Sequence, residues 1–289
     1  MKNSEMEDIT KNDETEIQLP KTVSIVEEIR IILASKFTLT FIVITAIAIA
    51  MQLVLFIVDI ISILLLIGLL ISYISAKSIT RFKQSGLKVI KVIPIINIVV
   101  IGIVMAYALY RCFVGFLVTS ILTEYGILYI IGGLIVTTIG TTMLFFNIYK
   151  LKAVNSIVHS LKHERASCEH LTIASIFEFI EGGFMALITL PLMVFSFVFN
   201  AFNSSIITKI SEIVKNFVSS AENVEEIIQS IKNAMPYITT LITFAFMAVA
   251  IIAAVKICLG IGILKIKDAN DRVKLNIKAS GGVQYRRNK

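Results

Sequence analysis

The stretch "FTLTFIVITAIAIAMQLVLFIVDIISILLLIGLLISYISA", residues 37–76, decides the fold of this chain. It holds forty residues and a single charged side chain, Asp59. One helix of that length would measure about 60 Å, roughly twice the thickness of a bilayer's hydrocarbon core. We therefore expect two membrane helices, 37–57 and 60–76, which turn at Asp59, because aspartate caps the start of a helix well.

Four more apolar runs follow, each long enough for a membrane helix of about 20 residues. They cover 92–110, 126–149, 179–202 and 237–264. The composition agrees, since 56% of the residues are hydrophobic and 16% are charged, whereas a soluble domain has about 45–50% and about 25%. The sequence therefore predicts an all-α polytopic membrane bundle with six transmembrane helices.

The basic residues predict the orientation of these helices. The loop 77–91, "KSITRFKQSGLKVIK", carries five basic residues and no acidic one, and the segment 265–289 carries eight against two aspartates. The turn at Asp59 carries none. Because basic loops stay in the cytoplasm, both termini are expected there. A single pass through 37–76 would place the basic loop outside.

The segments around the six-span domain 37–264 are polar or amphipathic. Residues 1–22 are acid-rich and are expected to be a disordered tail. Within 23–36 the apolar residues share one helical face, which predicts a helix in the plane of the inner membrane interface. That face consists of Ile25, Val26, Ile29, Ile32 and Leu33.

The last two segments lie on opposite sides of the expected membrane. In 203–236 the apolar residues are three or four positions apart, so we expect an extracytoplasmic loop of two short amphipathic helices. Pro236 stands just before the last span, where its missing N–H costs nothing. The basic tail 265–289 is cytoplasmic in this scheme and is expected to contact anionic lipid.

Three charges lie within the expected spans or at their edge. Glu178 and Glu181 are three residues apart, and Lys256 lies nine residues before Lys265 on the antiparallel last helix. Charges within a span are costly and are candidates for function. Three interpretations compete: snorkelling to the headgroups, a structural ion pair, and a transport or proton-relay role. We expect snorkelling with partial pairing.

Two other patterns concern packing and metal binding. Gly126, Gly133 and Gly140 are seven residues apart, which predicts a helix–helix seam in lipid and, as an alternative, a pore lining. The stretch "HSLKHERASCEH", residues 159–170, holds every histidine of the chain. The weak metal-ligand candidates in it are His159, His163, Cys168 and His170.

The histidine stretch lacks the features of a metal site. The HxxxH pattern has no glutamate beside its first histidine, as a metalloprotease would. Nearby Lys162 and Arg165 disfavour a divalent cation, so we expect a solvated cytoplasmic loop without metal. The three cysteines show no paired spacing, which argues against a disulfide framework.

The stretches "DIISILLLIGLLISYISAK", residues 59–77, and "SGLKVIKVIPIINIV", residues 85–99, carry a family resemblance. They resemble uncharacterised multi-pass membrane proteins of low-GC Gram-positive bacteria. The resemblance covers the second and third spans. It implies the multi-span topology and no particular chemistry.

Function is constrained mainly by what the sequence lacks. It has no Ser/His/Asp set and no phosphate-binding glycine loop, so we expect no enzymatic activity and no cofactor. The Ile- and Lys-rich, Trp-free composition is typical of a bacterial plasma-membrane protein. We expect a scaffold or accessory subunit that packs in the lipid bilayer with other membrane proteins or with copies of itself. The alternative is a small transporter or channel that uses Glu178, Glu181 and Lys256. A nucleic-acid partner is not needed to explain the basic charge.

Overall fold

The computed structural model describes residues 24–56, 59–78, 82–119, 124–202, 208–209, 212–213 and 224–279. The expected acidic tail 1–22, half of the loop 203–236 and the end of the basic tail, 280–289, lie outside these ranges. The long elements of the described residues are all helices: α1 (Ile25–Leu33), α2 (Lys36–Val54), α3 (Ile60–Lys77), α4 (Ser85–Thr119), α5 (Glu124–His163), α6 (Leu171–Ala201) and α8 (Val224–Ala279).

Six of these helices, all except α1, are long and apolar enough to cross a membrane. The predicted fold class, a helical membrane bundle with six spans, is confirmed. The first two spans form the expected hairpin, because α2 ends at Val54 and α3 begins at Ile60. Asp59 caps α3 by accepting a hydrogen bond from the N–H of Ile61 at 3.0 Å. The N–H of Asp59 in turn donates to Gln52 Oε1 at 3.1 Å, which braces a turn that lacks Gly and Pro.

Helix α1 has the predicted amphipathic face, and that face packs on protein. Ile25, Ile29 and Leu33 are buried in one apolar cluster with residues of α3, α5 and α8. Arg30 ties α1 to the end of α3, since Nε donates to the carbonyl of Ala76 and Nη2 to that of Ser78, both at 2.9 Å. The position of α1 at a membrane interface stays a prediction.

Helix α8 runs through both boundaries that the sequence suggested, at 236 and at 264. Pro236 lies inside it, and the helix continues into the basic segment as far as Ala279. Transmembrane helices tolerate an interior proline when nearby side chains or neighbouring helices compensate. The basic segment stays helical because Ile266, Ala269 and Val273 form an apolar face that is buried against the bundle.

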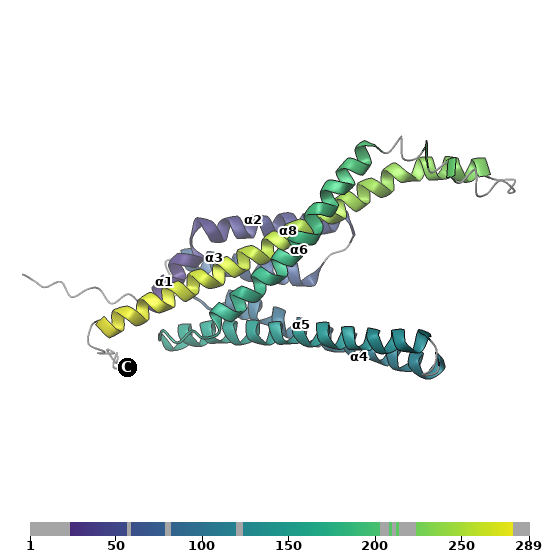
Figure 1. Ribbon diagram of the computed structural model, residues 1–289. Coiled ribbons are helices and arrows are strands. Elements are labelled where there is room, and N and C mark those ends of the chain that lie inside the picture. Colours follow the sequence, from purple (N-terminus) through teal and green to yellow (C-terminus); the bar gives the residue numbers. More distant parts are fainter. Residues whose placement is uncertain are drawn as a thin grey trace, which may run out of the picture.

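The helices of the bundle pack together at one end and spread apart at the other. We call the end that holds α1, the turn 164–170 and the last turns of α8 the α1 end, and the end where α2 turns into α3 the far end. Helices α4 and α5 form one long hairpin, α6 and α8 form another, and the two diverge away from the α1 end (Figure 1). The larger buried apolar cluster lies at the α1 end.

Candidate functional site

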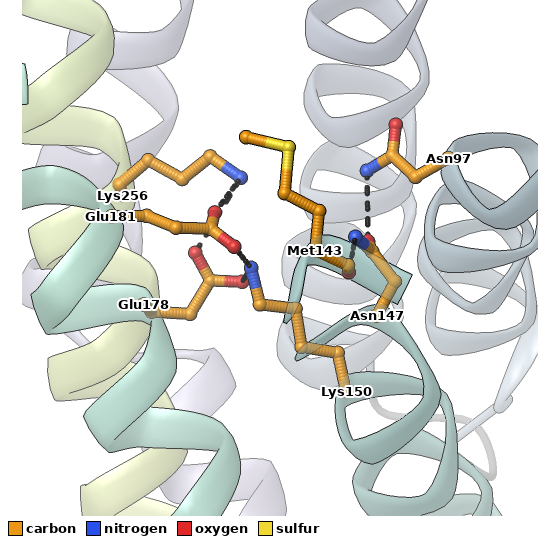
Figure 2. A network of polar contacts seen from close by, with 7 residues as sticks. All are labelled: Asn97, Met143, Asn147, Lys150, Glu178, Glu181 and Lys256. Atoms are coloured by element: carbon orange, nitrogen blue, oxygen red, sulfur yellow. Dashed lines mark hydrogen bonds and ion pairs between the residues drawn. The ribbon is translucent and has the colours of Figure 1, made fainter. Parts of the chain in front are cut away.

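Four charged side chains from three helices meet in the half of the bundle toward the α1 end. They are Lys150 of α5, Glu178 and Glu181 of α6, and Lys256 of α8, and we call them the charge ring (Figure 2). Lys150 Nζ lies 2.9 Å from Glu178 Oε1 and 2.6 Å from Glu181 Oε1. Lys256 Nζ lies 3.6 Å from Glu178 Oε2 and 3.0 Å from Glu181 Oε2.

The local geometry explains how the ring closes. Residues three apart on a helix lie on the same face, so both carboxylates of α6 point the same way. Each carboxylate offers one oxygen to Lys150 and the other to Lys256. Positive and negative groups therefore alternate around the ring, and its net charge is zero.

The ring is shielded from solvent on the Glu178 side. The side chain of Glu178 is 3% exposed and that of Lys150 is 9% exposed, while those of Glu181 and Lys256 are 19% and 22% exposed. An isolated ion in such a place would cost several kcal/mol, which only good pairing offsets. Among the described residues, no group donates a hydrogen bond to Glu178 Oε2, because Lys256 Nζ at 3.6 Å is too far away.

Two asparagines extend the polar layer from the ring to α4. Asn97 Nδ2 donates to Asn147 Oδ1 at 3.1 Å, and Asn147 Nδ2 donates to the carbonyl of Met143 at 2.9 Å (Figure 2). Asn147 is three residues before Lys150, so the two lie on the same side of α5. The polar layer consequently links α4, α5, α6 and α8.

A cavity of about 150 Å³ lies beside this layer. On α8 it extends from Ile252 to Ile266, and two thirds of its lining residues are aliphatic, aromatic or proline. Its polar lining consists of Thr38, Asp59, Ser62, Asn97, Asn147, Lys150, Glu178 and Lys256. The cavity is therefore mainly apolar, with one polar stretch formed by ring residues and the asparagines.

The structure brings the three intramembrane charge candidates together. Glu178, Glu181 and Lys256 form ion pairs, where we expected mainly snorkelling. The sequence interpretation missed Lys150, because Lys150 directly follows the apolar run 126–149 and resembled a boundary charge. Helix α5 continues to His163, so Lys150 lies about 20 Å before the helix end. The three-residue spacing of Asn147 and Lys150, which places both on one side of a helix, was the feature of the sequence that could have identified Lys150.

Two of the three candidate glycines face α4. A Cβ on Gly140 would meet Met105 Sδ at 2.5 Å, and one on Gly133 would lie 3.8 Å from the Cβ of Cys112. These two positions therefore allow α5 to lie close to α4. Gly126 lies in the first turn of α5.

The histidine stretch exposes its three histidines, as in the solvated segment that we expected, and buries Cys168. The rings of His159 and His163 lie beside each other in a tilted arrangement on the last turns of α5, with centroids 4.3 Å apart, and His170 directly precedes α6. Cys168 is buried, and its N–H donates to Asn270 Oδ1 of α8 at 3.1 Å. Asn270 is itself buried, so this hydrogen bond holds the turn at Cys168 against α8.

No metal site emerges from these residues. Over the described ranges, no three His, Cys, Asp or Glu side chains come close enough to hold a metal ion. Burial raises the pKa of the Cys168 thiol above its ordinary value, against a smaller opposing effect of the hydrogen bond to Ser160. The buried thiol is thus a poor nucleophile at neutral pH.

Comparison with known proteins adds no further assignment: no family model, curated protein or solved structure matches the chain.

Proposed function

We propose that this integral membrane protein is a non-enzymatic scaffold or accessory subunit of a membrane assembly. The observation that carries the proposal is the exposure of the α4–α5 hairpin. In the most apolar 18-residue window of each span, 6% of α4 and of α5 is buried, against 33% of α2 and of α3. The apolar windows of this hairpin contribute so little to their own bundle that they are well placed to pack against another membrane protein or a second copy.

The exposed side of α4 has suitable chemistry for a helix partner. Ile103, Val104 and Tyr107 are 64%, 59% and 63% exposed. Gly102, beside them, has open space where a Cβ would stand. Small residues let a second helix approach closely in lipid, where dispersion contacts hold helices together. We call Gly102, Ile103, Val104 and Tyr107 the α4 face.

The charge ring also favours a structural role. Every charge in it has two partners of opposite sign, so no unpaired ion is left for a substrate to neutralise. A ring that joins α5, α6 and α8 fixes the two hairpins together at one level. The part of α4 and α5 toward the far end then extends from a half of the bundle that the ring holds rigid.

We place the protein in a bacterial plasma membrane with the α1 end in the cytoplasm. Basic residues near this end support that orientation under the positive-inside rule. They include Lys36, Lys77, Lys83, Lys88, Lys162, Arg165, Lys265, Lys267, Arg272, Lys274 and Lys278.

Photo-crosslinking in living cells tests the scaffold proposal. A photoreactive benzoylphenylalanine at Val104 should give a discrete higher-mass adduct, which mass spectrometry can identify. The matched control is Val43 of α2, which is 50% exposed but lies on the packed half of the bundle. No protein adduct at Val104, or the same adducts from both positions, would contradict the proposed face.

A transporter or channel is the second candidate, because the cavity is lined by polar groups of six helices inside a membrane bundle. Flux assays in liposomes distinguish the two candidates. A proton or ion flux that is lost in Glu178→Gln, while the variant keeps its thermal stability, would support transport. The scaffold proposal expects no flux and a measurable loss of stability.

A further inference from the structure

The cavity has the dimensions of a binding site for one hydrocarbon chain. Ile252 and Ile266, which line it, are fourteen residues apart on α8, a distance of about 21 Å along the helix. One lipid chain covers half of the hydrocarbon core, or about 15 Å. A volume of about 150 Å³ spread over this length is narrow, so it excludes a bulky molecule and leaves room for at most one chain.

The residues that line the cavity indicate whether it holds a hydrocarbon chain or water. Phe41, Leu65, Ile93 and Leu259 are typical of its walls, which are two-thirds hydrocarbon. The apolar part of the wall favours hydrocarbon over water, because cavities lined by Leu, Ile and Phe stay dry and bind apolar molecules such as benzene. A water-filled path would need polar groups along the whole length, whereas here apolar residues separate the polar stretch beside the ring from Thr38 and from Asp59 and Ser62.

The polar part of the lining indicates which kind of lipid would bind. Glu178 is 2% exposed, lines the cavity, and keeps one carboxylate oxygen, Oε2, without a hydrogen-bond donor. A buried acceptor left without a donor is costly, so a ligand hydroxyl beside it would be stabilising. An anionic headgroup would add a third negative charge next to Glu178 and Glu181, and a cationic one would meet Lys150 and Lys256.

We propose that this cavity binds one uncharged, hydroxyl-bearing long-chain lipid, of the long-chain alcohol or glyceride class. Its hydroxyl donates to Glu178 Oε2, and its chain lies along α8 between Lys256 and Ile266. This inference concerns a ligand site and does not depend on the scaffold role.

Fluorescence quenching can test the site directly, because the chain contains no tryptophan. Phe37 lines the cavity, so Phe37→Trp places the sole indole on its wall. The control, Tyr107→Trp, places it on a side chain that is 63% exposed. Each variant is reconstituted in nanodiscs and titrated with dibrominated octadecanol, whose bromine atoms quench indole on contact.

The proposal predicts that the alcohol quenches Phe37→Trp saturably at low mole fraction, while Tyr107→Trp is quenched only in proportion to the alcohol in the bilayer. The dibrominated fatty acid and the dibrominated alkane should bind about tenfold more weakly, because neither offers a hydroxyl to an ionised acceptor. Proportional quenching of both variants would overturn the site. Equal saturable quenching by alcohol and fatty acid would overturn the assignment of the headgroup.

A cavity-filling variant separates a site from general partitioning. Val154 lines the cavity, so adding Val154→Phe to Phe37→Trp should abolish saturable quenching. Val99→Phe, at a lipid-exposed position of α4, is the matched control and should leave quenching unchanged. A thermal melt shows whether each variant is folded. If folded Val154→Phe still shows saturable quenching, the chain is bound elsewhere and the proposal is wrong.

Discussion

The α2–α3 hairpin and the α4–α5 hairpin have similar hydropathy and very different packing. The most apolar window of α4 has a mean hydropathy of 2.6 and is 6% buried, whereas that of α2 has 2.3 and is 33% buried. Lipid chains are as apolar as leucine, so burial between helices in a membrane gains little from the hydrophobic effect. Hydropathy therefore locates the spans, and other residues decide which spans pack together.

Those other residues are polar or small, and they gather in the half toward the α1 end. The charge ring joins three helices there. Gly68 and Gly86 allow α3 and α4 to cross closely, and Arg30 and Asn270 bond to backbone groups of neighbouring segments. The far half of the α4–α5 hairpin has only its own helix–helix seam. The predictions below compare the two halves.

The largest loss of stability is expected from Lys150→Met. This change leaves the almost fully buried Glu178 with Lys256 alone, at 3.6 Å. Breaking a buried ion pair by removing one partner costs about 3–5 kcal/mol. Denaturant unfolding in mixed micelles measures the loss. Lys162→Met, at an exposed position of the same helix, should stay within about 0.5 kcal/mol; equal losses would mean that the ring does not hold the helices.

A smaller effect is expected at two glycines of α4, with opposite sign in the two halves. A Cβ on Gly86 would collide with Ser72 Oγ and with the backbone carbonyl of Gly68, so Gly86→Ala should destabilise by about 1–3 kcal/mol. Gly102 has no atom within 4 Å of that position, and alanine favours a helix by about 1 kcal/mol. Gly102→Ala should therefore be neutral or stabilising. The same unfolding assay compares the two, and a loss at Gly102 would show hidden packing in the far half.

The alkylation rate of the Cys168 thiol measures how tightly the α1 end is packed. Because burial raises its thiol pKa, the reactive thiolate is scarcer at pH 7–8 than for an ordinary cysteine, and the alkylation rate should keep rising above pH 9. The measurement uses a variant with Cys112 and Cys258 changed to Ala. The control adds Cys168→Ala and Glu169→Cys, an exposed neighbour. Equal rates at pH 7.5 would show that the turn is open.

The smallest effect is expected at the histidines. Together His159→Ala, His163→Ala and His170→Ala should change the free energy of unfolding by about 1 kcal/mol or less, since they remove only ring contacts at the surface. Elemental analysis of the unmodified protein should find no zinc, copper or iron in proportion to the chain. One metal ion per chain that the triple variant loses would refute the absence of a site.

The spans were predictable because membrane thickness imposes a length on apolar runs. The turn at Asp59 followed from the same argument. Helix rise on antiparallel helices made a pairing of Lys256 with Glu178 or Glu181 one of three interpretations, and snorkelling with partial pairing was the one expected. Lys150 was missed because its helix extends past the apolar run, and apolar length does not show where a helix ends. The cavity and the packed turn at Cys168 depend on how distant helices meet, which one-dimensional patterns do not contain.

The double variant Lys256→Met with Glu181→Gln tests most directly whether the ring is a structural tie. Lys256→Met alone leaves two carboxylates for Lys150 and should destabilise by about 2–3 kcal/mol. Adding Glu181→Gln restores a neutral Lys150–Glu178 pair, so the account predicts recovery of much of that loss and a coupling free energy of about 1 kcal/mol or more. Additive losses in the same unfolding assay, or no loss from Lys256→Met, would contradict a ring that holds the helices together.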